Sequence, residues 1–260
     1  MSAAARSVVQ VQVLNAAKQQ VSKDVPYAVH LPRGVKADAA HDFAVVLCPA
    51  AGGKMDAGPL AALGDALAAR DVPALRYECL GPHLPTRIAV TAALLRAPPP
   101  GLRGVTRWLG VGTSMGCRVC CALAADGVLQ GAALLSFPLV EPASKESRAE
   151  ELTATPADTP LLLVRGTRDK YTPQAEWQAA RDALAAAGRK APKVVEVEGA
   201  DHSLKVPRAK QQDADALVTR EVVEFVLSVQ SPPAAPPLRA AGGGDAPVEE
   251  EQQPARKKAR

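Results

Sequence analysis

Aromatic residues are scarce in this chain of 260 residues, where Phe, Trp and Tyr together make up 3%. The apolar share of 47% still allows one large α/β domain or two small ones, so the core must be built mainly from Ala, Val and Leu. Long apolar runs are also missing: none approaches the roughly 20 residues that a membrane-spanning helix needs. We therefore expect no membrane partner.

A strong excess of one charge is absent as well. The formal net charge is +4, and basic residues are interspersed with acidic ones. A nucleic-acid-binding domain usually carries a basic stripe, so we expect no nucleic acid contact by the folded domain. The composition favours a small-molecule acyl substrate instead.

Cysteine occurs in an odd number, and no secretory signal precedes it. The five residues are Cys48, Cys79, Cys117, Cys120 and Cys121. This usage predicts reduced thiols and a cytoplasmic location. Cys117 and Cys120 form a C-x-x-C without a second pair or a nearby His, so we expect small buried helix residues and no metal site.

Short apolar runs alternate with Ala- and Leu-rich segments along most of the chain. Two N-terminal strands, 7–13 and 25–31, are expected to form an antiparallel edge hairpin around a turn at 17–22, followed by buried strands at 43–48, 73–77, 108–111, 131–136, 161–165 and 194–197. Helices are expected at 60–70, 87–95, 115–125, 174–187 and 213–229, with Thr172 as N-cap and Pro173 in the first turn of the fourth. The alternation predicts an α/β fold with a mostly parallel, doubly wound sheet.

The two ends of the chain differ from this pattern. We expect a short N-terminal extension at 1–6, one domain at 7–230, and a disordered Pro-, Gly- and Glu-rich tail at 231–260. The tail closes on a basic cluster, Arg256 to Arg260, which is compatible with a nuclear-import signal and equally with a solvated terminus. Protein partners, where there are any, are expected at this tail.

The most informative motif is Gly112-Thr113-Ser114-Met115-Gly116, between a predicted strand and a predicted helix. This is the setting of a G-x-S-x-G nucleophile elbow, in which the serine side chain stands above the sheet in a strained turn. Side chains in place of Gly112 and Gly116 would collide with neighbouring backbone. A plain turn that ends a strand is the alternative. The context favours Ser114 as a nucleophile.

A serine nucleophile needs a base and an acid, which an α/β-hydrolase supplies in the order Ser, Asp, His. Of the four histidines, only His202 follows the last predicted strand. Asp169 follows the strand 161–165 and is the best candidate to orient the imidazole, although a turn-forming role is the alternative. Asp158 lies at the wrong end of that strand, and Asp201 is adjacent to His202 in a loop where neighbouring side chains diverge.

An oxyanion hole would combine the N–H of Met115 with one from the loop Pro49-Ala50-Ala51-Gly52-Gly53-Lys54. Pro49 has no N–H, so Ala51 is the first choice and Ala50 the second. A plain glycine-rich connection is the alternative. A phosphate-binding role is disfavoured because the full P-loop pattern is absent. This chemistry requires no cofactor.

Six landmarks occur in a specific order: Ala51-Gly52-Gly53, Leu75-Arg76-Tyr77, Gly112 to Arg118, Ser136-Phe137-Pro138-Leu139, Gly166-Thr167-Arg168-Asp169 and Ala200-Asp201-His202-Ser203. In these the chain resembles the alpha/beta-hydrolase-like family of the testis-expressed protein thirty and the third regulatory subunit of the NSL histone-acetyltransferase complex. The resemblance covers about residues 25 to 229. It implies that Ser114, Asp169 and His202 are nucleophile, acid and base.

The chain departs from that family at Pro49-Ala50, where relatives commonly carry His-Gly. Arg76 and Arg118 match basic positions of the family, but we interpret them as structural ion-pair partners.

Two hypotheses follow. The first is a serine hydrolase acting on an ester, thioester or amide, whose short polar segment 140–159 leaves the site without a large lid. The second is a non-catalytic binding platform in a nuclear or chromatin-associated complex, because a fold alone does not imply catalysis.

Overall fold

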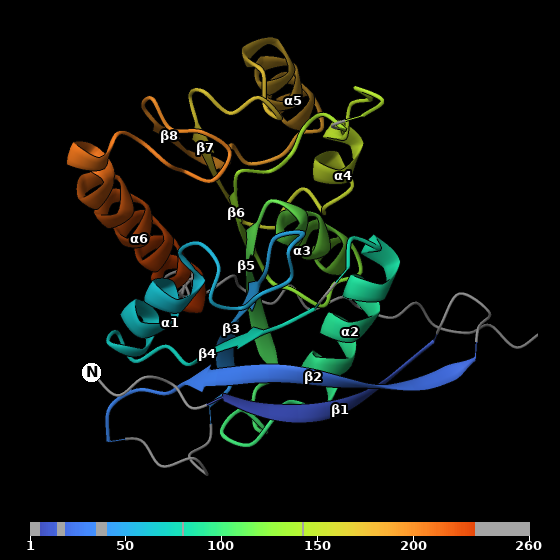
Figure 1. Ribbon diagram of the computed structural model, residues 1–260. Helices are drawn as coiled ribbons and strands as arrows, with labels where there is room; N and C mark the ends of the chain where they lie inside the picture. Colours follow the sequence, from blue (N-terminus) through green and yellow to red (C-terminus); the bar gives the residue numbers. More distant parts are fainter. Residues whose placement is uncertain (1–5, 15–18, 35–40, 80, 142, 232–260) are drawn as a thin grey trace, which may run out of the picture.

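A single eight-stranded sheet organises the molecule (Figure 1). The computed structural model describes residues 6–14, 19–34, 41–79, 81–141 and 143–231. The strands are β1 (Arg6–Leu14), β2 (Gln20–His30), β3 (Phe43–Cys48), β4 (Ala74–Tyr77), β5 (Arg107–Thr113), β6 (Ala132–Leu135), β7 (Leu161–Gly166) and β8 (Lys193–Val197). Their order in the sheet is β1-β2-β4-β3-β5-β6-β7-β8.

The sheet is mostly parallel, as predicted. β1 pairs with β2, and β2 with β4, in antiparallel fashion, while the strands from β4 to β8 are paired parallel to one another. The predicted N-terminal hairpin therefore forms one edge of the sheet. β2 begins at Gln20, so part of the predicted turn at 17–22 is strand instead, and residues 15–18 lie outside the described residues.

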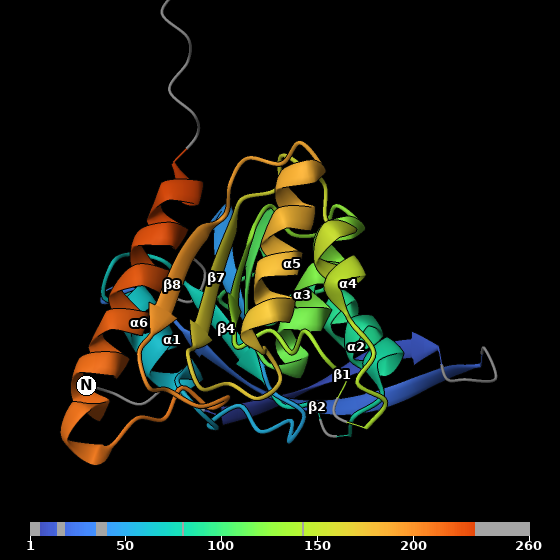
Figure 2. The ribbon, with the colours of Figure 1, turned by 90° about the horizontal axis from the view of Figure 1, so that it is seen from above.

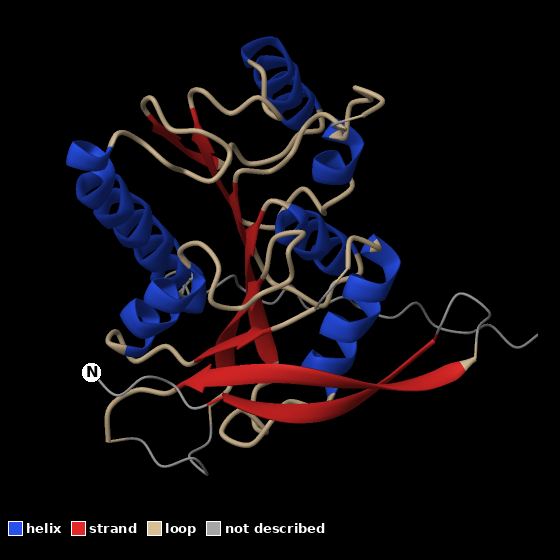
Figure 3. Ribbon diagram, in the orientation of Figure 1, coloured by secondary structure: helices blue, strands red, loops and turns tan. Residues whose placement is uncertain are grey.

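Helices cover both faces of the sheet (Figures 1 and 2). α1 (Leu60–Ala68) and α6 (Arg208–Gln230) pack on one face, and α2 (Leu84–Arg96), α3 (Met115–Ala125), α4 (Ala149–Thr153) and α5 (Gln174–Ala186) lie on the other. Figure 3, coloured by secondary structure, shows the sheet passing between the two groups. This is the α/β-hydrolase arrangement of a central sheet between helical layers.

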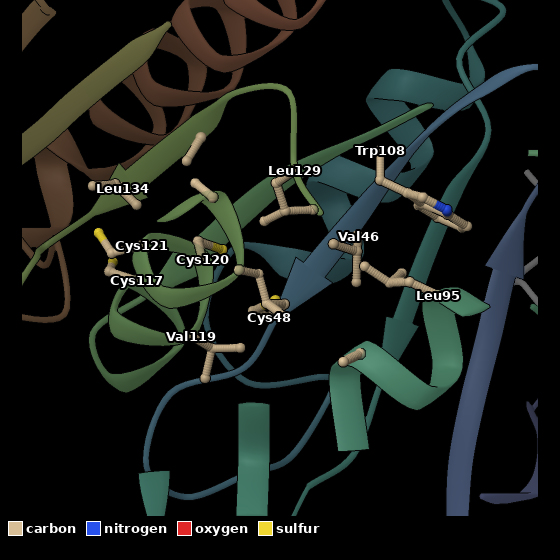
Figure 4. Close-up of a cluster of buried hydrophobic side chains, with 14 of the residues drawn as sticks. Val46, Cys48, Leu95, Trp108, Cys117, Val119, Cys120, Cys121, Leu129 and Leu134 are labelled. Carbon is tan, nitrogen blue, oxygen red and sulfur yellow. The ribbon is translucent and has the colours of Figure 1, made fainter. Parts of the chain in front are cut away.

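Two hydrophobic cores result from the alternation of side chains along buried strands. In β3, Val45 and Leu47 pack toward α1 and α6, whereas Val46 and Cys48 pack toward α2 and α3. Figure 4 shows the core on the face of α2 and α3, where three cysteines of α3 lie among aliphatic side chains. All five cysteines are buried and free in the structure.

Some sequence predictions need correction. α4 was not predicted, and α6 begins at Arg208 instead of Asp213. Thr172 is not the N-cap of α5: the cap position is Pro173, and the Thr172 hydroxyl donates to the carbonyl oxygen of Phe137 at 2.8 Å.

The predicted domain ends remain predictions. The described elements run from Arg6 to Gln230, and residues 1–5 and the tail from 232 on, with its basic cluster, lie outside the described residues.

Between β6 and β7, α4 is the only helix in the described residues, so the structure carries no lid domain there. None of the helices in the described part of the chain has the length and apolar character needed to cross a bilayer.

Candidate active site

The elbow at the end of β5 has the strained geometry that its sequence predicts. Ser114 has φ 50° and ψ −112°, a region that L-residues rarely adopt, and α3 begins at the next residue. A Cβ at position 112 would lie 2.4 Å from the carbonyl carbon of Gly116, and one at position 116 would lie 2.1 Å from the carbonyl oxygen of Cys48. Both glycines are required by close backbone approach.

Helix α3 is anchored to the sheet directly beneath this turn. The Cys117 thiol hydrogen-bonds to the carbonyl oxygens of Gly112 and Leu135, each at 3.2 Å, and the Ser114 amide donates to Leu135 O at 3.0 Å. Burial raises the pKa of the Cys117 thiol well above its usual value. This cysteine therefore fixes the elbow and is held as a neutral thiol.

The structure brings Ser114, His202 and Asp169 together. His202 Nε2 lies 2.8 Å from Ser114 Oγ, and His202 Nδ1 lies 2.8 Å from Asp169 Oδ2. Since an ionised carboxylate only accepts hydrogen bonds, the neutral imidazole carries its proton on Nδ1 and leaves Nε2 to accept from the serine hydroxyl. The three side chains come from the carboxyl ends of β5, β7 and β8, where ligands of such sheets bind.

Asp169 is held rigidly. Its side chain is fully buried, and its Oδ1 accepts the Tyr171 amide at 2.9 Å. The backbone of the Asp169 loop packs closely on the loop that carries His202, because a Cβ at position 166 would lie 2.2 Å from the carbonyl oxygen of Ala200. Asp169 and His202 are thus positioned by two loops in direct contact.

Asp201, His30 and His83 have structural partners of their own. Asp201 Oδ1 accepts the amides of Ser203 and Lys205, which shapes the loop around His202. His30 is buried between Asp65 and Arg76, and His83 caps α2 by accepting the Thr86 amide. The expectation that Asp201 does not serve as the orienting acid agrees with this geometry.

A cavity of about 420 Å³ opens beside Ser114 and His202. Ala50, Ala51 and Gly52 line one side of it, and Leu135 and Ser136 line another. Ala50 does not adopt a positive φ, so its backbone conformation is one that an alanine adopts without strain. Met115 is the first residue of α3, and its N–H belongs to the unpaired first turn of that helix.

Arg76 and Arg118 lie in ion pairs, as expected. Arg76 pairs with Asp56 and donates to His30, and Arg118 donates to both oxygens of Glu151 on α4 at 2.8 and 2.5 Å.

The described residues contain no cluster of three or more His, Cys, Asp or Glu side chains suited to a metal ion.

Two residues near the site were missed by sequence reasoning. The Tyr171 ring packs edge-on against the His202 imidazole, and Arg87 of α2 is fully buried behind the loop that lines the cavity. A basic residue inside an otherwise apolar helical pattern was the only available signal for Arg87. Nothing in the sequence indicated Tyr171.

Comparisons with known proteins agree with the fold. The model of the family described as "Alpha/beta hydrolase domain" matches residues 88–230. Among curated proteins, no sequence matches this chain significantly.

Similar solved structures include Est1E from Butyrivibrio proteoclasticus, with 17% identity and a TM-score of 0.62 over 85% of this chain and 98% of that one. A dienelactone hydrolase from Anabaena variabilis has 14% identity and a TM-score of 0.61 over 87% and 99% of the two chains. An a/b serine hydrolase without lid from Xanthomonas campestris has 16% identity and a TM-score of 0.58 over 84% and 94%. At these identities the likeness shows the fold.

Proposed function

The chain belongs to the alpha/beta hydrolase domain family, and from this premise we propose that it is a serine hydrolase that cleaves an ester, thioester or amide through an acyl-enzyme. One observation carries the proposal: Ser114, His202 and Asp169 form a continuous hydrogen-bonded series with both links at 2.8 Å. A serine hydroxyl is a weak nucleophile, and this series supplies the base that activates it.

In the proposed mechanism, Ser114 Oγ attacks the substrate carbonyl carbon while His202 Nε2 takes its proton. The carboxylate of Asp169 accepts a hydrogen bond from Nδ1–H and stabilises the imidazolium that forms. The N–H groups of Met115 and Ala51 stabilise the oxyanion, with Ala50 as the alternative to Ala51. His202 then returns the proton to the leaving group, and water attacks the acyl-enzyme by the reverse route.

The substrates we propose are small or presented on an exposed group. The lack of a lid in the described residues and a cavity of about 420 Å³ favour short acyl chains. Small alanine and glycine residues on the cavity wall let the substrate carbonyl approach the backbone. The proposal therefore names a carboxylesterase or thioesterase-like activity.

A fluorophosphonate probe tests the proposal. Wild-type protein should be labelled covalently and should hydrolyse chromogenic esters, best with the shorter chains of a panel. Ser114→Ala should abolish both while the protein stays folded. A wild-type protein that takes up no probe and cleaves no ester of the panel would contradict the proposal.

The second candidate is a non-catalytic platform in a nuclear or chromatin-associated complex. The resemblance to the family of the testis-expressed protein thirty and the NSL subunit supports it, together with the basic cluster Arg256 to Arg260. The same labelling experiment separates the two candidates, because a platform needs no reactive serine. The intact Ser-Asp-His arrangement favours the enzyme.

A further inference from the structure

We propose that Arg87 is the positioning residue of the oxyanion loop: its buried guanidinium holds the carbonyl oxygens of residues 49–51 and so turns the N–H groups of that loop toward the cavity. The inference rests on the proposed function. Arg87 touches no reacting atom in it, and acts only through the loop backbone.

Arg87 is the largest of the fully buried side chains, with 1% exposure. All of its hydrogen bonds go to main-chain carbonyl oxygens. Nη1 donates to Pro49 at 2.8 Å, Nη2 to Ala50 at 2.9 Å, to Ala51 at 3.1 Å and to Cys79 at 2.7 Å, and Nε to Gly81 at 2.8 Å. In the described residues no carboxylate pairs with it. A buried cation without a counterion is costly unless it is hydrogen-bonded, and here each guanidinium nitrogen donates to at least one of the five carbonyl oxygens.

The consequence for the loop follows from peptide geometry. In a trans peptide unit, the N–H points opposite to the C=O. Because the carbonyls of Pro49, Ala50 and Ala51 face the guanidinium, the N–H groups of residues 50, 51 and 52 face away from it. The same three residues line the cavity beside Ser114. In the described part of the chain, none of these three N–H groups has a hydrogen-bond acceptor.

The loop is braced from a second side. The Gly53 amide donates to Ala50 O at 2.8 Å, which closes a turn over residues 50–53, and the Cys79 amide donates to Gly53 O at 2.9 Å. Cys79 O in turn accepts from Arg87. One guanidinium therefore joins the segment after β3 to the segment after β4, and its positive charge polarises the peptide units whose N–H ends face the cavity.

The chain offers a matched control in Arg189. It is 7% exposed and, like Arg87, donates to backbone carbonyls, in this case those of Thr155, Pro156 and Thr159 in a single loop. That loop precedes β7 and lies at the opposite end of the sheet from Ser114. A lysine at either position keeps the charge but cannot bridge the same set of acceptors.

The test compares Arg87→Lys and Arg189→Lys on short-chain p-nitrophenyl esters. Removing an oxyanion donor costs about 100- to 1,000-fold in kcat, so a misplaced donor should cost roughly 10- to 100-fold in kcat with little change in KM. Affinity for an alkylboronic acid, whose serine adduct carries an oxyanion, should fall by a similar factor. Arg189→Lys should lower the melting temperature comparably and leave kcat within about twofold.

A second measurement does not depend on the folding of an Arg87 variant. In wild-type protein labelled with ¹⁵N-alanine, the boronic acid should shift the Ala51 or Ala50 amide resonance downfield, with assignment by Ala50→Gly and Ala51→Gly. Unmoved amides in a boronate-bound protein would overturn the inference, as would a folded Arg87→Lys whose kcat matches that of Arg189→Lys. A wild-type protein that neither cleaves esters nor binds boronate would instead refute the proposed function, and this role of Arg87 with it.

Discussion

The Tyr171 ring lies edge-on against the imidazole of His202, with ring centroids 4.5 Å apart and planes at 79°. Tyr171 also donates its amide to Asp169 Oδ1, and Lys170 Nζ lies 5.1 Å from the centroid of its ring. One residue thus contacts both Asp169, through its backbone, and His202, through its side chain. A substitution at position 171 therefore removes the ring contact with His202 and leaves the amide that binds Asp169 in place.

Replacing Tyr171 with Ala should weaken the positioning of His202. Aromatic pairs contribute about 0.5–1.5 kcal/mol beyond their buried area, which corresponds to roughly 2- to 12-fold in kcat. Tyr171→Phe keeps the ring and should retain wild-type kcat on the same esters. Equal losses in the two variants would show that the hydroxyl, and not the ring contact, matters.

Gly166→Ala should push the loop that carries Asp169 away from the loop that carries His202. The new Cβ would lie 2.2 Å from the carbonyl oxygen of Ala200, which is backbone and cannot rotate away. Overpacking of this kind costs about 1–3 kcal/mol of unfolding free energy. Because the loop after Ala200 carries His202, kcat should fall roughly 10- to 100-fold.

Gly131→Ala is the matched control for this change. Its new Cβ would lie 3.2 Å from the carbonyl oxygen of Pro160, at the end of the sheet away from Ser114. Denaturant unfolding should show a smaller loss of stability, and ester hydrolysis should be unchanged. If Gly166→Ala kept full activity, close packing of the two loops would not be what aligns His202.

The architecture could be predicted because its signals are local. Buried strands are short apolar runs, and the elbow glycines are required by contacts within five residues and with the neighbouring strand. That Ser114, Asp169 and His202 lie at one edge also follows from a rule of topology, because the carboxyl ends of parallel strands share an edge.

The missed features depend on contacts distant in sequence. Arg87 binds carbonyls 36 to 38 residues away, which an Arg in a helical pattern does not indicate. The Thr172 hydroxyl was expected to cap α5 but donates to Phe137, 35 residues away. The first turn of α6 is polar, so its apolar period begins only after the helix has started.

The thiols should be unreactive in the folded protein. All five cysteines are buried, and burial raises the pKa of Cys117 and of Cys121. Ellman's reagent should therefore detect almost no thiol in native protein and five after denaturation. Rapid labelling of native protein would contradict the burial of these thiols.

A buried histidine between two charged side chains gives a final prediction, about how stability depends on pH. His30 of β2 lies between two charged groups: its Nδ1 is 2.9 Å from Asp65 Oδ1 of α1, and its Nε2 accepts from Arg76 Nε of β4 at 2.7 Å. Burial lowers the pKa of His30, and the positive charge of Arg76 adds to this effect, against the hydrogen bond to Asp65. The folded protein therefore holds this imidazole neutral.

Stability should consequently fall as the solution becomes mildly acidic. The unfolded chain protonates His30 near pH 6.5, whereas the folded protein resists protonation, so the unfolded state binds more protons below that pH. The His30 contribution is fully present above about pH 6.5 and is lost as pH falls through the lower folded pKa, with a slope of at most about 1.4 kcal/mol per pH unit for one proton. His30→Gln can keep both hydrogen bonds without titrating, so urea unfolding of this variant should show a flatter dependence between about pH 7 and about pH 5. Parallel curves for wild type and His30→Gln would assign the acid sensitivity to other groups, because only the difference between the two proteins isolates this imidazole.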